Sequence, residues 1–238
     1  MSSPSPLPRL IFTSILALLT LIFLALGTWQ IQRLFWKLDL IARVDARVDA
    51  APVLAPSPQN WANITADRDE YRHVTATGTF DHKKEALVQA VTERGAGFWV
   101  VTPLTRNDGT TILINRGFVP ADRRDAASRA EGEIAGTAQI TGLLRITEPG
   151  GAFLRSNDPQ NGRWYSRDVA AITAAEGLAN TAPYFIDADA TPNPGGLPIG
   201  GLTVVQFRNT HLVYALTWFA MALMSAGAGW FVYRRRFA

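Results

Sequence analysis

The sequence predicts an α+β protein in which two transmembrane helices, N- and C-terminal, bracket one antiparallel β-rich soluble domain. Two apolar runs, Leu10–Trp29 and Leu212–Tyr233, contain no Asp, Glu, Lys or Arg, and a span of the hydrocarbon core needs about 20 such residues. Between them lie short segments rich in Val, Ile, Thr and aromatic residues, which is typical of strands. We therefore expect tails at 1–9 and 234–238, spans at 10–30 and 209–233, and a soluble domain at 31–208.

The first run is the stronger span. Twelve of its 20 residues are Leu, Ile or Phe, which corresponds to about −4 to −7 kcal/mol of insertion free energy. A cleaved signal peptide is the alternative, because Ala25, Leu26 and Gly27 resemble a cleavage site. The run is longer than a signal's apolar region, however, and Trp29 suits an interfacial anchor. Apolar residues recur at helical spacing as far as Ala42, so we expect the helix to continue outward until the prolines that begin at Pro52.

The second run is less hydrophobic. It has seven Leu, Val or Phe residues in 22 positions and a stretch of small residues, Ser225–Gly229. Small residues let helix backbones approach closely, so this stretch is expected to pack against the first span or against another membrane protein.

Six segments of the soluble domain are predicted to be strands. They are Val74–Phe80, Ala86–Val91, Phe98–Leu104, Thr111–Arg116, Ala138–Leu144 and Tyr184–Ile186. Gly109, preceded by Asn107 and Asp108, predicts a hairpin between the third and fourth of these.

Two short helices are expected in the same domain, one around Asp122–Ala130 and one over Asp168–Glu176, which Gly177 would close. The Pro- and Gly-rich segment Thr191–Gly201 is predicted to lack regular structure and to serve as the tether back to the membrane.

The distribution of charge predicts the topology. Arg234, Arg235 and Arg236 follow the second span directly, and basic residues near a span end stay cytoplasmic. Both termini are then cytoplasmic, and the domain faces a periplasm-like compartment. We expect a bacterial inner membrane, because residues 1–9 are too few for a mitochondrial transit peptide.

The net charge of +3 hides a split, since residues 34–207 hold all 20 acidic residues but only 17 basic ones. The basic excess therefore lies at the membrane ends, which argues against nucleic acid as a partner.

Several classes of function are excluded or unsupported. The chain has no cysteine, which excludes thiolate metal sites, thioredoxin-type exchange and covalent c-type haem attachment. His73 and His82 flank one predicted strand and are interpreted as surface histidines. No hydrolase or nucleotide-binding motif is present, so we expect no enzymatic activity.

His211 is the third histidine and lies at the outer edge of the second span, with Tyr214 and Trp218 on roughly the same helix face. One interpretation is an interfacial histidine whose ring reaches the lipid headgroups. The other is an axial ligand of haem iron, because neutral imidazole is a common ligand and an ionisable group at a span suggests function.

The outer end of the first span would lie beside His211 in an antiparallel pair. There Trp29, Arg33 and Trp36 follow a spacing of i, i+4, i+7 and give one face two aromatic rings and a cation. Such a face suits a large planar amphiphile that carries carboxylates. The alternative is an aromatic belt with an arginine that binds lipid headgroups.

At these residues the chain resembles the Surfeit-locus (Surf or Shy) family of cytochrome c oxidase assembly factors. The first matching pattern is Gly-x-Trp-Gln-x-x-Arg-x-x-Trp-Lys at Gly27–Lys37. Further matches are Thr102–Leu104, Asn115–Pro120 (with Phe118 where the family often has Trp), Thr141–Arg145 and Asn209–Phe219.

The resemblance implies a non-enzymatic role, in which the protein binds haem a and aids its insertion into subunit I of haem-copper oxidase. It implies that His211 is the haem ligand and that Trp29, Gln30 and Arg33 support it. Haem A synthase is a further candidate partner. We expect the farnesyl tail to lie in membrane lipid, the iron on His211 and the propionates near Arg33. The alternatives are a cofactor-free scaffold for nascent subunit I and, with no residues to support it, a periplasmic hydrolase.

Overall fold

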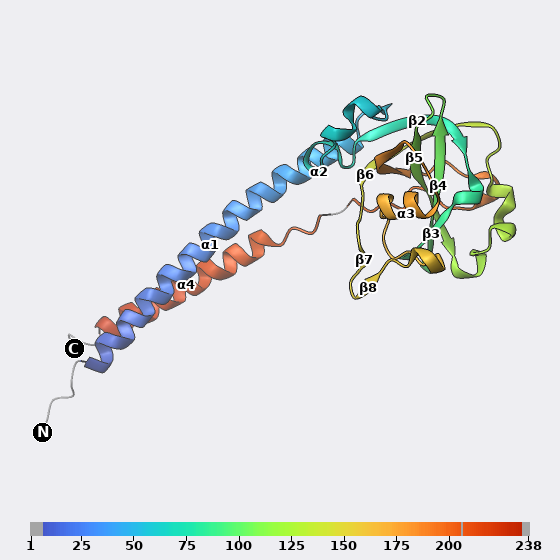
Figure 1. The fold of residues 1–238 in the computed structure, drawn as a ribbon. Coiled ribbons are helices and arrows are strands. Elements are labelled where there is room, and N and C mark those ends of the chain that lie inside the picture. Colours follow the sequence, from blue (N-terminus) through green and yellow to red (C-terminus); the bar gives the residue numbers. More distant parts are fainter. Residues whose placement is uncertain (1–6, 206, 235–238) are drawn as a thin grey trace, which may run out of the picture. The chain divides into compact units, whose positions relative to one another are not determined.

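The computed structural model describes residues 7–205 and 207–234, which form two compact units (Figure 1). The helical unit contains residues up to 43 and from 207 onward, and the β-rich unit contains residues 44–205. The predicted α+β class, with an apolar helix at each end of a β-rich domain, is confirmed.

Two long helices, α1 (Leu7–Val48) and α4 (His211–Arg234), run antiparallel and side by side in the helical unit (Figure 1). Both are long and apolar enough to cross a membrane. As predicted, α1 continues past Ala42 and ends before Pro52. Of the three arginines used to predict topology, Arg235 and Arg236 lie outside the described residues.

The contact face between the two helices uses small and polar residues. The Thr20 and Ser225 hydroxyl oxygens lie 2.8 Å apart, and Gly229 packs beside Leu16. Ser225 and Gly229 are buried, whereas Ala226, Gly227 and Ala228 between them are exposed. The small-residue stretch therefore packs against the first span through one face, which is one of the two predicted outcomes.

Nine strands form the β-rich unit, seven of them in one sheet of order β1-β2-β6-β9-β5-β4-β3. Their bounds are β1 Val53–Leu54, β2 His73–Phe80, β3 Ala86–Thr92, β4 Gly95–Arg106, β5 Thr111–Pro120, β6 Thr137–Ile146, β7 Gly151–Ala152, β8 Arg155–Ser156 and β9 Thr181–Ala188. All six predicted strands are present, most of them longer than expected.

The sheet closes on itself, because the end of β4 pairs with the end of β2, joining Phe80 to Leu104. Strands β2, β6, β9, β5 and β4 thus form a five-stranded barrel. An odd number of strands cannot alternate in direction all the way round, and β9 lies parallel to β5. The short β1 also pairs parallel with β2. The sheet is therefore mixed rather than purely antiparallel.

Apolar residues from alternate positions of these strands fill the barrel. Among them are Val74, Leu104, Ile112, Ile114, Leu144, Tyr184 and Ile186. A second cluster on the outer side of β5 and β9 packs Leu113 and Phe185 against Ile172 of α3 (Val169–Ala175). As predicted, Asp168 caps α3 and Gly177 follows it with a positive φ of 61°.

Two local predictions were wrong. The segment around Asp122–Ala130 forms two 3-10 helices, Ala121–Arg123 and Ala126–Gly132, because the backbone of Asp125 between them is extended (ψ 129°), and the second helix is itself kinked at Arg129 (φ −141°). The segment Thr191–Gly201 is not a free tether. It contains a 3-10 turn at Pro194–Gly196, and Ile199 exchanges two backbone hydrogen bonds of 2.9 Å with Phe118 of β5.

Candidate functional site

His211 is the first residue of α4, and its backbone N–H donates to the Asn209 side-chain oxygen at 3.3 Å. Its imidazole faces α1, where Nδ1 lies 2.7 Å from Oε1 of Gln30. A carboxamide oxygen only accepts, so Nδ1 carries a proton, and in the neutral ring the lone pair is then on Nε2. No described residue bonds Nε2. In metal-ligating histidines the nitrogen that does not bind the metal commonly donates to an acceptor in this way.

Two aromatic contacts hold the helices together beside this pair. The Trp218 ring stacks on Phe23 at 5.8 Å between centroids. A Cβ on Gly27 would lie only 2.7 Å from the Phe219 ring, so glycine is what lets that ring seat against α1. Trp218 thus lies in the helix contact, half-buried, rather than beside His211 on an open face.

The other predicted residues lie on an exposed flank of the helix pair. Trp29 and Trp36 are about half exposed, and the Arg33 guanidinium carbon lies 4.3 Å from the Trp36 ring centroid. With 3.6 residues per turn, these three residues lie roughly a quarter turn around α1 from Gln30. Helical spacing and the antiparallel arrangement put Tyr214, which is 54% exposed, on the same side of the pair.

This flank combines an imidazole, exposed aromatic rings and the Arg33 guanidinium on helices that expose many large apolar side chains. Imidazole is a common ligand of haem iron and guanidinium pairs with carboxylates, so the chemistry of these residues is compatible with a haem. Within the described residues there is no cluster of three His, Asp or Glu side chains that could hold a free metal ion.

A buried ion network in the β-rich unit was not predicted from the sequence. Asp187 of β9 is 2% exposed and accepts hydrogen bonds from four side chains. Asn115 donates to Oδ1 at 2.7 Å, Arg167 to Oδ1 at 2.9 Å and Oδ2 at 3.3 Å, and Arg145 and Thr203 to Oδ2 at 2.8 Å and 2.9 Å. Asn115 and Arg145 each belong to a motif that carries the family resemblance. These two motifs therefore contribute residues to the buried ion network of the barrel, whereas the motifs on the helices contribute residues to the exposed flank.

The same network sets the charge state of Arg167. Burial opposes its charge, but the carboxylates of Asp187 and Glu148 outweigh burial and raise the pKa of Arg167. The Arg167 Nε atom donates to Glu148 at 3.1 Å. This arginine is consequently a fixed cation at any physiological pH.

A second buried arginine, Arg116, has no carboxylate among its hydrogen-bond partners in the described part of the chain. Its guanidinium donates to the Gly132 carbonyl, to Asn193 Oδ1 at 2.9 Å and to His82 Nδ1 at 3.4 Å. Burial lowers the pKa of Arg116 to about 10. The neighbouring His82 Nε2 donates to the Ile134 carbonyl at 3.2 Å.

The two histidines of the β-rich unit are each partly buried and hydrogen-bonded, rather than simple surface residues. His73 Nδ1 lies 2.8 Å from the Ala50 carbonyl oxygen, and His82 is held by Arg116. His73 begins β2 and His82 begins the 3-10 turn His82–Lys84 that follows it. Their partners lie elsewhere in the chain, so sequence spacing alone could not reveal them.

Comparison with known proteins agrees with the resemblance seen in the sequence. The family model described as SURF1 family matches residues 17–223. The chain is 38% identical over 228 residues to a Homo sapiens protein named Surfeit locus protein 1, which covers 87% of this chain and 73% of the human one. The Rattus norvegicus protein of that name is 40% identical over 215 residues, covering 82% and 67%. A SURF1-like protein of Monosiga brevicollis is 38% identical over 226 residues, covering 89% and 83%. This chain belongs to the SURF1 family.

Proposed function

We propose that this protein is an assembly factor for haem-copper (cytochrome c) oxidase that binds haem a and aids its insertion into subunit I. Membership of the SURF1 family supports the assembly role. The observation that carries the haem proposal is the His211–Gln30 hydrogen bond of 2.7 Å, which leaves Nε2 available at the edge of a helix pair.

Each residue of the flank has a task in this proposal. His211 holds the iron through Nε2, and Gln30 orients the imidazole. Trp29 and Tyr214 cover the macrocycle, and Arg33 pairs with the propionates. The haem is cargo, and its redox chemistry belongs to the recipient oxidase. A single protein ligand suits a carrier, because an acceptor that offers two histidines can then withdraw the haem.

We further propose that both termini are cytoplasmic and that the β-rich unit lies in the periplasm of a bacterial cell. Arg234, next to the second span, supports this orientation through the positive-inside rule. The flank then lies at the outer surface of the membrane, where the farnesyl tail enters lipid and the propionates remain in water.

Haem binding is tested by purifying the full chain from cells that make haem A and recording the Soret absorbance per protein. His211→Ala is expected to lose most of the haem, and His73→Ala, which removes a histidine from the other unit, is expected to keep it. Equal haem content in the His211→Ala variant and the wild type would overturn the ligand assignment.

The assembly role is tested separately by co-purification with subunit I. Under the proposal, His211→Ala reduces oxidase haem content in cells even when the variant still binds subunit I. A wild-type protein that remains colourless with ample haem A, yet still co-purifies with subunit I, would replace the haem carrier with a cofactor-free scaffold.

A further inference from the structure

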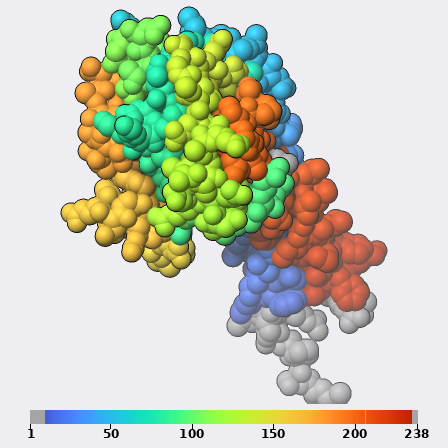
Figure 2. Space-filling model, turned by 90° about the vertical axis from the view of Figure 1, so that its right-hand side faces the viewer, coloured from blue at the N-terminus to red at the C-terminus, as the bar shows by residue number. Residues whose placement is uncertain are grey.

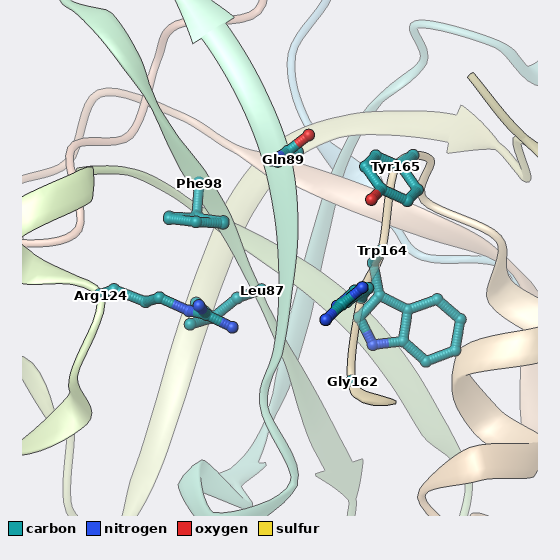
Figure 3. Close-up of a pocket in the computed structure, with 8 residues that line it drawn as sticks. Leu87, Gln89, Phe98, Arg124, Gly162, Trp164 and Tyr165 are labelled. Carbon is teal, nitrogen blue, oxygen red and sulfur yellow. The ribbon is translucent and has the colours of Figure 1, made fainter. Parts of the chain in front are cut away.

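A groove runs along the outer face of β3 and β4 in the β-rich unit. It consists of two adjoining hollows of about 200 Å³ and about 520 Å³ that share Gln89, Phe98 and Tyr165. In the smaller hollow, Arg124 reaches in from one side and Trp164 and Tyr165 lie on the other (Figure 3). Nothing in the proposed haem function uses this surface.

Three arginines line this groove, and no carboxylate does. Arg124 and Arg163 line the smaller hollow, and Arg155 lines the larger one. Arg124 stacks on Phe98 at 5.2 Å, and Arg155 stacks on Tyr165 at 5.5 Å. Aromatic stacking fixes the position of a guanidinium and leaves its edge N–H donors free to bind a ligand, as for Arg124.

The three arginines of the groove form no ion pair with a carboxylate within the described residues. Six other arginines each pair with a carboxylate: Arg68, Arg72, Arg106, Arg129, Arg145 and Arg167. In the part of the chain that the structure describes, Arg124, Arg155 and Arg163 have no such partner. The nearby carboxylate of Asp158 instead accepts a hydrogen bond of 2.7 Å from the side-chain amide of Asn161.

The charge of the surroundings makes the groove distinct. Residues 44–205 contain 19 acidic and 15 basic residues, so a cluster of three arginines without carboxylate partners is a local positive patch in an acidic unit. Arg155 donates to the Gln89 side-chain oxygen at 3.0 Å. Uncompensated guanidinium groups in a groove favour a ligand that carries carboxylates or phosphates.

The far end of the groove is apolar. Phe153, at the tip of the β7–β8 hairpin, lines the larger hollow and is 91% exposed, and Val91 on its rim is 87% exposed. Figure 2 shows the yellow chain segment that contains this hairpin protruding from the surface of the unit. An exposed aromatic residue beside a hollow marks a place where another molecule packs.

The outer edge of β3 is bridged at its centre by Trp164, and no other described pairing lies on this edge. β3 is the last strand of its sheet, and the Gln89 N–H donates to the Trp164 carbonyl at 2.8 Å. An edge strand is a template for a further strand from another protein.

We propose that this groove binds an extended peptide segment of a partner protein that combines acidic residues with an apolar or aromatic side chain. The carboxylates pair with Arg124 and Arg163, and the apolar side chain packs against Phe153. The negative charge of this peptide distinguishes it from a basic or purely apolar segment. Its extended length distinguishes it from a free anion.

The test uses the full chain in phosphatidylcholine nanodiscs and two fluorescein-labelled peptides, Glu-Glu-Phe-Leu-Glu-Glu and Lys-Lys-Phe-Leu-Lys-Lys. Fluorescence anisotropy is expected to show that the acidic peptide binds and the basic one does not. The double variant Arg124→Gln/Arg163→Gln should bind the acidic peptide at least tenfold more weakly. The matched control, Arg68→Gln/Lys83→Gln, removes the same charge elsewhere and should bind like the wild type.

Two further measurements make the result decisive. The charge-reversed variant Arg124→Glu/Arg163→Glu should prefer the basic peptide, and Phe153→Ser, an exposed change, should weaken the acidic one severalfold. Equal binding by the Gln variant and the wild type would overturn the proposal. So would complete displacement of the peptide by an equal concentration of inorganic phosphate, or arginine-dependent binding to phosphatidylglycerol vesicles without any binding of peptide.

Discussion

The imidazole Nδ1 of His211 and the side-chain oxygen of Gln30 lie 2.7 Å apart, although 181 residues separate them in the chain. This hydrogen bond joins the first residue of α4 to the middle of α1. It determines which imidazole nitrogen remains available, and therefore which nitrogen a metal could use.

Removing the acceptor should weaken haem binding even though the ligand remains. Gln30→Leu leaves Nδ1 without its partner, and loss of such a supporting hydrogen bond commonly lowers metal affinity by about 10- to 100-fold. Gln30→Glu keeps an acceptor and should retain haem. Titration of both variants with haem, followed at the Soret band, checks this, and equal affinity for all three proteins would contradict the positioning role of Gln30.

Close approach of the helices should depend on Gly27. Gly27→Ala places a Cβ 2.7 Å from the Phe219 ring, and overpacking of this kind costs about 1–3 kcal/mol. Because the chain has no cysteine, a Thr20→Cys/Ser225→Cys pair can report helix association by disulfide formation. Gly27→Ala should reduce the yield of that disulfide.

The matched control for Gly27 is Gly227→Ala on α4, where an added Cβ would meet nothing within 4 Å. The Thr20→Cys/Ser225→Cys protein with Gly227→Ala should have the same disulfide yield and haem content as the Thr20→Cys/Ser225→Cys protein without it. If both alanine variants behaved alike, the Gly27–Phe219 contact would not be what sets the helix separation.

Loss of Asp187 should destabilise the β-rich unit strongly. Asp187→Ala leaves Arg145 and Arg167 without their shared carboxylate, and breaking a buried ion pair costs about 3–5 kcal/mol. Urea unfolding of the full chain, followed by near-UV circular dichroism, measures the change. The exposed Asp122→Ala should stay within about 0.5 kcal/mol of the wild type.

Tyr184 should make the β-rich unit sensitive to alkali. Its hydroxyl donates to the Pro56 carbonyl at 2.9 Å, and burial raises its pKa above the ordinary value of 10.0. The unfolded chain therefore releases this proton at a pH where the folded chain retains it. The stability that Tyr184 contributes is fully present below pH 10 and is lost as the pH rises above it.

In Tyr184→Phe, the stability at neutral pH should fall by about 1 kcal/mol through the lost hydrogen bond, and the decline above pH 10 should become shallower. Thermal unfolding between pH 7 and pH 11 measures both effects. Arg116, whose pKa is lowered to about 10, acts in the opposite direction, but both proteins contain it and its contribution cancels in the comparison. Parallel curves for the two proteins would contradict the assignment to Tyr184.

The residues of α1 and α4 show which features sequence spacing can predict and which it cannot. The Trp29, Arg33 and Trp36 spacing correctly puts these residues on one face of α1, because the helical period is fixed by backbone hydrogen bonds within the helix. The spacing could not decide which face of α1 meets α4. Gln30 lies on that face, and Trp218 stacks on Phe23 in the contact between the helices.

The sequence by itself determined the two apolar helices, the six main strands and the caps of α3, since these depend on local composition, period and hydrogen bonding. Only the tertiary structure decided the barrel closure, the Asp187 network and the seating of Ile199 on Phe118. These features join residues distant in the chain. Their free energy comes from burial and ion pairing that exist only once the strands have assembled, so no local pattern encodes them.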